Sequence, residues 1–301
     1  MRKKVAILMG GWSTEREVSL VSGTAVSQSL KQAGYQVTLI DVQRDIGSLL
    51  AQLLPKPDVV FNALHGRFGE DGSVQALLDI LDIPYTYSGL LASAIAMDKP
   101  MSKRLFEKEG LSVAKHIIIS RKDVLAGGFM SLPYVIKPTN EGSSVGVHIV
   151  KSERNKVVLA NGIWPFGEKV MVEAFIEGRE LTVSVMGDQA LAVTEITTDQ
   201  GFYNYSAKYE KAGSLHVIPA KIEKTVYDQA MQMAVTAHQA LGCRGVSRAD
   251  FRYDGQTLYI LEVNTQPGMT PMSLVPEQAA YAGISFEDLV VWMVENAECD
   301  S

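Results

Sequence analysis

The oxygen-bearing side chains of Asp250, Glu262 and Asn264 are spaced so that they could hold a metal ion. Alternate residues of a strand face the same side, so Glu262 and Asn264 would project together, and a hairpin that closes through residues 255–257 would place Asp250 opposite Glu262. Hard oxygen ligands without His or Cys suit Mg²⁺, which often shares its site with nucleotide phosphates. A solvated polar face on an exposed sheet is the alternative, but the apolar content of residues 258–263 favours a strand that is covered on at least one side.

A second motif could surround phosphate groups. Lys137 ends an apolar, strand-like run, and the sequence E-G-S-S-V-G follows at 141–146. Backbone N–H groups and hydroxyls in such a loop can contact phosphate oxygens, while a lysine on the strand supplies a positive charge. The motif is neither the G-x-x-x-x-G-K-[ST] loop nor a dinucleotide fingerprint. Taken alone, a Ser/Gly hairpin turn beside a surface lysine is the more common meaning of such a sequence.

Two further motifs follow expected strands near the N-terminus. They are G-G-W-S-T-E-R-E-V-S at 10–19 and H-G-R-F-G-E-D-G at 65–72. Glu15 could face a cleft and hold a substrate ammonium, or it could stabilise a helix N-terminus, as carboxylates in that position do. His65 is at the point where an α/β sheet places its ligands. The acidic residues that follow it could simply cap the next helix.

The elements that must position these motifs change in character along the chain. Apolar runs and amphipathic segments alternate at first, with strands at 4–9, 36–41 and 58–64 and helices at 17–32, 45–54 and 73–81. This order predicts a parallel, doubly wound sheet with ligands at the carboxyl ends of its strands.

After residue 97 the pattern predicts α+β structure. A helix that carries Lys103 and Lys108 leads to strands at 115–119, 133–137, 145–150 and 169–175, and then to strands at 181–186, 189–196, 215–220, 246–253 and 258–264, with an amphipathic helix at 223–241. We therefore expect three domains, at 1–97, 98–180 and 181–301.

Composition excludes several classes of protein. The 301 residues are 47% hydrophobic and 21% charged, which is typical of a soluble globular chain of two or three domains. The net charge is −6, with no run of Lys and Arg interleaved with aromatic residues, which argues against nucleic acid as a partner. Cys243 and Cys299 provide no disulfide framework, and the apolar run at 5–9 is too short for a signal peptide or a membrane span. We expect a cytoplasmic protein with no membrane partner.

Five ordered motifs together resemble those of the D-alanine:D-alanine ligases of the ATP-grasp superfamily. They are G-G-W-S-T-E-R-E-V-S-L, H-G-R-F-G-E-D-G-S-V-Q-A, Y-V-I-K-P-T-N-E-G-S-S-V-G, F-Y-N-Y-S-A-K-Y and L-E-V-N-T-Q-P-G-M-T, and they span nearly the whole chain. Residues 151–168 carry no signature of the family. The resemblance implies an N-terminal α/β domain followed by a two-domain ATP-grasp fold, with ATP between the central and C-terminal domains.

The resemblance also implies roles for individual residues. Those expected to contact ATP are Lys99, Lys137, Glu173, Ala174, Phe175, Ile176, Glu180 and Lys208, with adenine at 173–176 and the ribose at Glu180. Asp250, Glu262 and Asn264 would hold two Mg²⁺ ions, or Mn²⁺ in their place. The catalytic set would be Glu15, Ser143, Tyr209, Arg248 and Gly268, and His65, Ser273 and Leu274 would also contact the amino acid substrates. The loop at 197–214 would close over ATP, and Tyr209 favours an amine as the second nucleophile.

The implied reaction is the ATP-dependent ligation of two D-alanines through an acyl phosphate, by a homodimer that serves peptidoglycan precursor synthesis. No covalent enzyme nucleophile is required, which agrees with the lack of a convincing Ser-His-Asp or Cys-His set in the sequence. One alternative is another ATP-grasp ligase that joins a different carboxylate and amine. Another is a regulatory protein on the same fold that has lost catalysis, but the intact Arg248 and the three candidate metal ligands argue against it.

Overall fold

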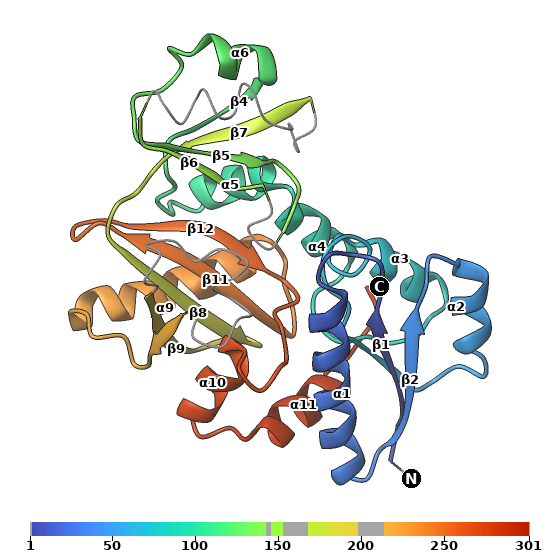
Figure 1. Ribbon diagram of the computed structural model, residues 1–301. Coiled ribbons are helices and arrows are strands. Elements are labelled where there is room, and N and C mark those ends of the chain that lie inside the picture. The colour runs from blue at the N-terminus through green and yellow to red at the C-terminus, as the bar shows by residue number, and fades with distance from the viewer. Residues whose placement is uncertain (1, 143–145, 153–167, 198–213, 301) are drawn as a thin grey trace.

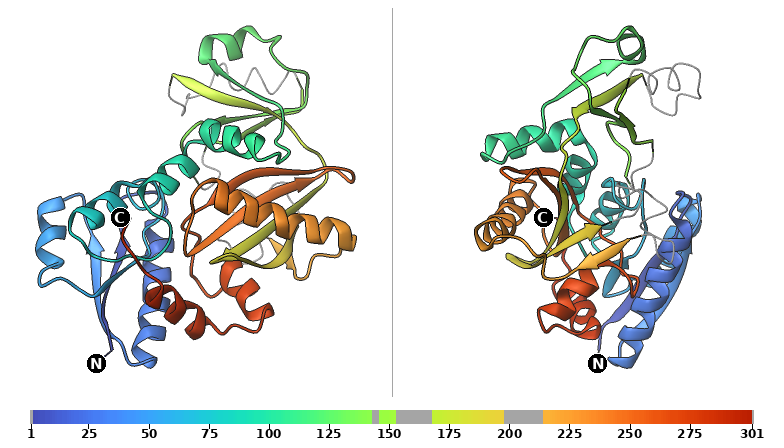
Figure 2. Two further views of the ribbon diagram at one scale, coloured as in Figure 1. Left: turned by 180° about the vertical axis from the view of Figure 1, so that it is seen from behind. Right: turned by 60° about the vertical axis from the view of Figure 1, so that its left-hand side comes forward.

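The computed structural model describes residues 2–142, 146–152, 168–197 and 214–300. Its elements form an N-terminal body with a parallel sheet, a central body with a small antiparallel sheet, and a larger C-terminal antiparallel sheet (Figures 1 and 2). The central body, in green, lies above the other two in Figure 1. No helix in these described ranges is long and apolar enough to span a bilayer.

The N-terminal sheet is parallel, has the strand order β2-β1-β3, and is covered on both faces. Val5 and Ile7 of β1 belong to one buried cluster, whereas Ala6 and Leu8 belong to another on the opposite face. This confirms the prediction of a doubly wound sheet, which requires both faces of its first strand to be apolar. The elements are β1 (Lys4–Gly10), α1 (Arg16–Gln32), β2 (Gln36–Val42), α2 (Ile46–Gln52), β3 (Val59–Asn62) and α3 (Ser73–Ile80).

The order of these strands determines where the sheet can bind a ligand. The chain leaves β1 for β2 on one side and then crosses to β3 on the other. The topological switch point therefore lies between the carboxyl ends of β1 and β3. The segments that begin at Gly10 and at Ala63 both start there, and these segments carry Glu15 and His65.

Two C-terminal helices complete the core of the N-terminal body. They are α10 (Leu274–Tyr281) and α11 (Phe286–Glu295), and neither is among the predicted elements. Leu289 and Met293 of α11 share a buried cluster with Ile7 of β1. In Figure 1 the red α11 lies directly beside the blue α1.

The chain also returns to this sheet after α11. Tyr85 forms an isolated parallel bridge with Val60 and an antiparallel bridge with Glu298. The hydrophobic core is thus shared between the first and last parts of the sequence. Domain boundaries at 97/98 and 180/181 remain a prediction.

The central body is built on a four-stranded antiparallel sheet with the order β4-β7-β5-β6. Helix α5 begins at Lys99 with the Asp98 side chain accepting a hydrogen bond from the Met101 N–H, and α4 and α6 were not predicted. The elements are α4 (Leu90–Met97), α5 (Lys99–Lys108), β4 (His116–Ser120), α6 (Arg121–Ala126), β5 (Tyr134–Pro138), β6 (His148–Val150) and β7 (Lys169–Ala174).

The C-terminal sheet has the order β10-β9-β8-β11-β12 and is antiparallel throughout. Helix α9 packs its apolar side, including Ala230, Met233 and Ala237, against this sheet, as its periodicity predicts. Strand β10 ends earlier than predicted, just before Ile218-Pro219, where proline has no N–H for the ladder. The elements are β8 (Arg179–Met186), β9 (Gln189–Thr197), β10 (Leu215–Val217), α9 (Lys224–Ala240), β11 (Val246–Tyr253) and β12 (Leu258–Asn264).

Candidate active site

The β11–β12 hairpin brings the three candidate metal ligands to one face of the sheet. Asp250 pairs with Glu262, as predicted, and Asn264 lies two residues further along the same face. The turn differs from the prediction, because the strands close around four residues, 254–257, rather than three. A β-bulge beside Asp250 shifts the register by one residue, and without this shift Asp250 would face Leu261.

Arg248 and Asp250 form a bidentate ion pair on this face. Arg248 donates from Nε to Asp250 Oδ1 at 2.9 Å and from Nη2 to Oδ2 at 2.8 Å, and Thr182 Oγ1 donates to Oδ1 at 2.6 Å. Both charged side chains are largely buried. The candidate oxyanion residue and a candidate metal ligand are therefore already in contact, so a cation at Asp250 would have to share this carboxylate with Arg248.

Lys99 connects the start of α5 to the hairpin. Its Nζ lies 3.1 Å from Glu262 Oε2 and donates to the carbonyl oxygen of Glu141 at 2.8 Å. Glu141 opens the loop that the sequence suggests for phosphate binding. The Lys99 ammonium group thus lies between the candidate metal site and the candidate phosphate loop, where it would attract a polyphosphate.

Lys137 belongs to a buried ionic cluster with Glu173 and Lys103. Lys137 Nζ lies 2.5 Å from Glu173 Oε2, and Lys103 Nζ lies 2.5 Å from Oε1. Burial raises the pKa of Glu173, but the two ammonium groups outweigh it and hold this pKa at about 2. Burial lowers the pKa of Lys137, but the charges of Glu173 and Glu262 outweigh burial and raise this pKa overall. For Lys103 burial is the larger effect, and the pKa is lowered. Lys103 was not predicted as a site residue, although it lies one helical turn after Lys99.

Arg252 organises the link between the central and C-terminal sheets. It donates to Ile176 O, to Gly178 O and to Glu180 Oε2, each at 3.1 Å, and its guanidinium carbon lies 5.7 Å from the centre of the Phe175 ring. Phe175 and Ile176 are among the residues predicted to receive adenine, and Glu180 is the residue predicted at the ribose. Sequence analysis missed Arg252, but strand alternation places it on the face that carries Asp250, and this was the available signal.

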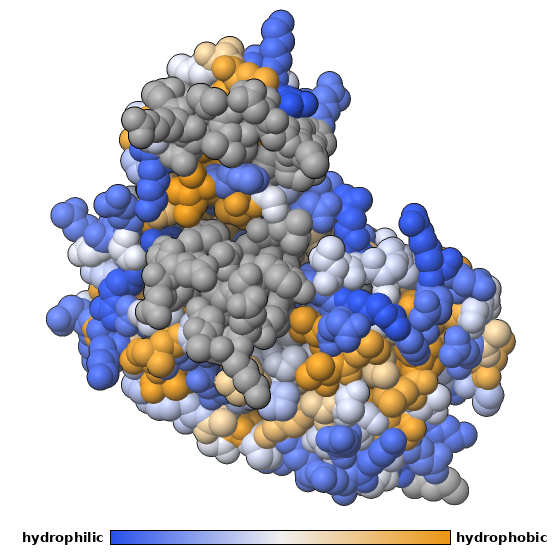
Figure 3. All heavy atoms as spheres, in the orientation of Figure 1, coloured by the Kyte–Doolittle hydropathy of each residue, from blue (hydrophilic) through white to orange (hydrophobic). Residues whose placement is uncertain are grey.

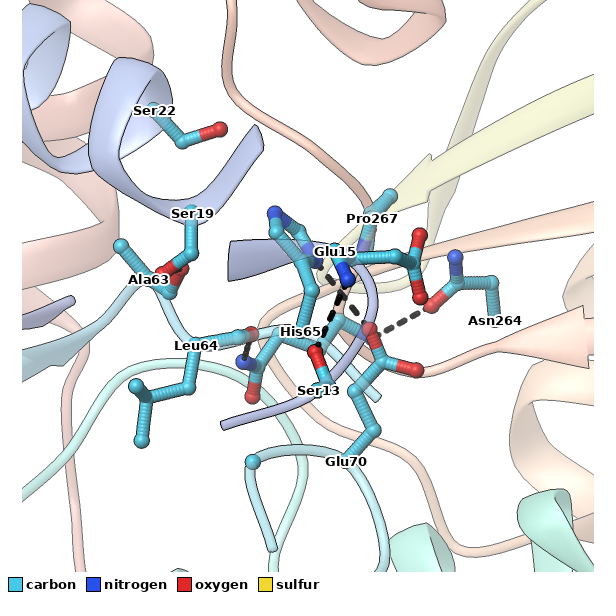
Figure 4. A network of polar contacts seen from close by, with 12 residues as sticks. Ser13, Glu15, Ser19, Ser22, Ala63, Leu64, His65, Glu70, Asn264 and Pro267 are labelled. Carbon is cyan, nitrogen blue, oxygen red and sulfur yellow. Dashed lines mark hydrogen bonds and ion pairs between the residues drawn. The ribbon is translucent and has the colours of Figure 1, made fainter. Parts of the chain in front are cut away.

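Glu15 and His65 approach one another from the carboxyl ends of β1 and β3. Glu15 occupies the N-cap position of α1 without a side-chain capping hydrogen bond, so any stabilisation that its carboxylate gives the helix N-terminus would come from its charge. Figure 4 shows its side chain directed toward the same space as Asn264. Glu70 does not cap α3 either, because that role at the helix start belongs to Asp71, which accepts from the N–H of Ser73.

Glu70 instead holds the His65 ring, with Nδ1 of His65 3.1 Å from Glu70 Oε1. Burial lowers the pKa of His65, but the Glu70 hydrogen bond and the charges of Glu70 and Glu15 outweigh it and raise the pKa above its usual value. His65 Nε2 is buried with no hydrogen-bond partner among the described residues. It faces Gly268, where an added Cβ would lie 4.0 Å from Nε2 and 3.1 Å from Ser273 Oγ. The absence of a side chain at Gly268 keeps this space open.

A cavity of about 500 Å³ collects site residues from the N-terminal body, the start of α5 and the β11–β12 hairpin. The predicted site residues that line it are Glu15, His65, Lys99, Arg248, Glu262, Asn264, Ser273 and Leu274. Val21 and Met272 also line the cavity and are exposed, and hydrophobic side chains gather on the molecular surface over α1 (Figure 3).

The other predicted residues lie elsewhere or outside the described ranges. Lys137, the residues predicted at the adenine and ribose, Asp250 and Gly268 are not among the residues that line this cavity. Ser143, Lys208 and Tyr209 fall outside the described residues, as does nearly all of the predicted closing loop.

Comparison with known proteins agrees with this arrangement. Family models described as D-ala D-ala ligase N-terminus and C-terminus match residues 4–52 with 47–88 and residues 105–295, respectively. The chain is 62% identical to a D-alanine–D-alanine ligase of Rhodospirillum rubrum over all of both chains. It is 53% identical to one from Sinorhizobium fredii, covering 99% of this chain and 98% of that one.

Solved structures show the same fold. A D-alanine–D-alanine ligase of Bacillus anthracis complexed with ATP has a TM-score of 0.83 at 29% identity and covers 98% of this chain and 96% of its own. The VanG D-Ala:D-Ser ligase of Enterococcus faecalis has a TM-score of 0.82 at 29% identity, covering 98% and 99%. The predicted ATP-grasp architecture is thereby confirmed, and the chain belongs to the D-alanine–D-alanine ligase family.

Proposed function

We propose that this protein joins two D-alanine molecules to form D-alanyl-D-alanine, converting ATP to ADP and phosphate, and that the dipeptide serves peptidoglycan precursor synthesis. The observation that carries the proposal is the shared cavity. Glu15 and His65 line it from the N-terminal body, and Lys99, Glu262 and Asn264 line it from the nucleotide side. An amino acid and a nucleotide phosphate could therefore meet in one space.

The chemistry needs activation of a carboxylate, because oxide is too poor a leaving group for direct attack by an amine. Transfer of the terminal phosphoryl group of ATP to the carboxylate of the first D-alanine gives an acyl phosphate. The amine of the second D-alanine then attacks the carbonyl carbon, and phosphate leaves as the peptide bond forms. Both steps develop negative charge, which fixed cations and N–H groups can stabilise.

The nucleotide would lie between the central and C-terminal sheets. Lys99 and Lys137 contact its phosphates, together with Lys208, while residues 173–176 receive adenine and Glu180 meets the ribose. In support, Lys103 and Lys137 share the single carboxylate of Glu173, and a polyphosphate would favour the protonated form of both lysines.

Asp250, Glu262 and Asn264 are suited to hold Mg²⁺, and Mn²⁺ takes similar ligands. Their side chains offer oxygen donors on one face of the hairpin, and Glu262 already attracts the Lys99 ammonium group at 3.1 Å. Two Mg²⁺ ions, when bound, would neutralise charge on the phosphates.

The amino acids would bind at the other end of the cavity. Glu15 holds the ammonium group of the first D-alanine, and His65 contacts the same substrate beside it. Arg248 and the backbone N–H of Gly268 stabilise the oxyanion, while Ser273 and Leu274 receive the carboxylate of the second D-alanine. Ser143 and Tyr209 complete the catalytic set. The enzyme would act as a cytoplasmic homodimer, without nucleic acid or membrane as a partner.

The test is a coupled assay of ADP release with and without D-alanine, with the product identified by mass spectrometry. We expect ADP release to require D-alanine and to yield D-alanyl-D-alanine. D-serine offered as a second substrate is an informative competitor, given the likeness to a D-Ala:D-Ser ligase. ADP release that responds only to another carboxylate and amine would favour a different ATP-grasp ligase. A protein that binds ATP and releases no ADP would support the regulatory alternative.

A further inference from the structure

A buried hydrogen bond between two carboxamides joins the N-terminal sheet to the end of the metal-site hairpin. Asn62 is the last residue of β3, and Gln266 follows β12 by two residues. Asn62 Nδ2 donates to Gln266 Oε1 at 2.6 Å, and both side chains are almost completely buried. A buried carboxamide is costly unless its polar atoms are paired, so each atom's partner matters.

The remaining atoms of this pair hold the backbone just before His65. The N–H of Leu64 donates to Asn62 Oδ1 at 3.2 Å, and Gln266 Nε2 donates to the carbonyl oxygen of Leu64. Both backbone polar groups of the residue preceding His65 are thus fixed by this one pair.

The same network also holds the backbone just before Glu70. The carbonyl oxygen of Gly69 accepts from Asn62 Nδ2 at 3.0 Å and from Gln75 Nε2 at 2.8 Å. Gln75 is buried as well. Both ends of the loop that carries His65 and Glu70 are therefore held by carboxamides.

Gln266 simultaneously belongs to the other half of the site. Its backbone N–H donates to Asn264 Oδ1 at 2.9 Å, which orients a candidate metal ligand. Gly268, which faces His65 Nε2, follows two residues later. Gln266 itself is not among the residues that line the cavity.

We propose that Gln266 is a positioning residue that aligns the amino acid site on the N-terminal sheet with the acyl-transfer site after β12. This rests on the proposed function, because it takes D-alanine as the ligand beside His65. A reacting group displaced by about 1 Å can cost on the order of 10²-fold in rate, so a contact that fixes the relative position of two substrate sites has kinetic consequences beyond stability. Loss of Gln266 should therefore impair the use of D-alanine selectively.

The first test is Gln266→Met, which keeps the side-chain length and removes its hydrogen bonds. We expect kcat/KM for D-alanine to fall by about ten-fold or more. The dissociation constant for ATP, measured by equilibrium binding without D-alanine, should stay within about two-fold of the parent. If Gln266 served only stability, its loss would not impair the use of D-alanine while leaving ATP binding unchanged.

His238→Leu is the matched control. It removes the buried hydrogen bond of 2.7 Å between His238 Nδ1 and Ser247 Oγ, which joins α9 to β11 away from the 64–70 loop. We expect a lower melting temperature and parental kinetics with D-alanine. A comparable fall in kcat/KM for D-alanine in this control would show that general loosening explains the effect, and it would overturn the assignment.

A double-mutant cycle and a milder variant complete the test. Because Asn62 and Gln266 act on the same loop, Asn62→Leu combined with Gln266→Met should be little worse than the more damaging single change. Gln75→Met removes one bond to Gly69 and should weaken the use of D-alanine less, which keeps the test informative if Gln266→Met does not fold. Additive effects in the double-mutant cycle would refute the positioning role of Gln266. Parental D-alanine kinetics in folded Gln266→Met or Gln75→Met would also refute it, and neither result would affect the proposed function. A parent enzyme without D-alanine-dependent ADP release would instead refute the proposed function.

Discussion

The ammonium group of Lys103 lies 2.5 Å from Glu173 Oε1, and the Lys103 side chain has no solvent exposure. Glu173 holds Lys137 through its second oxygen, at the same distance. Two lysines therefore share one carboxylate inside the central body. A second protonated lysine is costly to bury there, and an anionic ligand would offset that cost.

Lys103→Met should weaken ATP binding while leaving the protein folded. Glu173 and Lys137 would remain as a neutral pair, so no buried charge loses its last partner, but the attraction for phosphate falls. We expect the dissociation constant for ATP to rise by about ten-fold, equivalent to about 1.4 kcal/mol. Isothermal titration calorimetry measures this, with Lys108→Met, an exposed lysine on the same helix, as the control. Parental ATP affinity in Lys103→Met would show that the cluster serves stability alone.

Glu262→Gln should leave the fold intact and remove most Mg²⁺-dependent turnover. The change removes the negative charge that contacts Lys99 and that would bind a divalent cation, and it hardly alters the volume of the side chain. We expect kcat to fall by on the order of 10²-fold or more, as for other lost electrostatic groups. Kinetics over a range of Mg²⁺ concentrations, with circular dichroism for folding, provide the measurement. The exposed Glu287→Gln should behave as the parent, and equal turnover in both variants would mean that the carboxylate cluster has been misassigned.

Glu70→Gln should lower the pKa of His65. In the parent, the Glu70 hydrogen bond and the two nearby carboxylates outweigh burial and hold the His65 pKa above its usual value of about 6.5. His65 therefore contributes stability that is fully present below the unfolded pKa and is lost as pH rises through the folded pKa. NMR titration of the imidazole should give a lower His65 pKa in Glu70→Gln than in the parent. The melting temperature, measured against pH, should show the loss of this stability beginning at a lower pH. Unchanged titration would mean that Glu70 does not set the charge of His65.

Replacing Cys243 and Cys299 by serine should have little effect on activity. Burial raises the pKa of Cys243 to about 12, and burial also raises the pKa of Cys299, so neither thiol is a thiolate near neutral pH. We expect turnover within about two-fold of the parent after correction for stability. A strong loss that persists in fully folded protein would point to a nucleophilic role for one of the thiols.

Arg252→Lys should weaken ATP binding although the charge is kept. An ammonium group cannot donate in the planar pattern with which Arg252 reaches Ile176, Gly178 and Glu180. We expect about a five-fold to ten-fold rise in the ATP dissociation constant, consistent with the loss of one or two hydrogen bonds. The exposed Arg104→Lys serves as the comparison, and identical affinities would exclude a role for Arg252 in shaping the adenine segment.

Local patterns were sufficient to predict most strands and the pairing of two candidate metal ligands. The alternation of β1 between two buried clusters follows directly from its continuous apolar sequence. The Asp250–Glu262 pairing was predicted with the wrong turn, because a bulge compensates for the extra turn residue, and a bulge leaves no pattern in hydrophobicity.

Contacts between distant segments could not be predicted in the same way. The amphipathic pattern of α11 indicates that it must pack on something, but not that its partner is β1 near the other end of the chain. Lys103 lies one helical turn after Lys99, and Gln266 lies inside a motif of the family, but neither sequence position reveals which distant residue the side chain contacts. Their importance becomes visible only where folding brings them beside Glu173 and Asn62.

The packing of α11 on the first sheet has a consequence for the order of events during biosynthesis. Strands β1 to β3 and helix α1 leave the ribosome long before residues 286–295 are made, so the apolar face of the sheet that α1 and α11 share stays only partly covered while the other two bodies form. Contacts of such long sequence separation slow folding and prolong exposure to chaperones and proteases. The sheet that carries Glu15 and His65 beyond its carboxyl ends therefore acquires its complete core only once nearly the whole polypeptide has been synthesised.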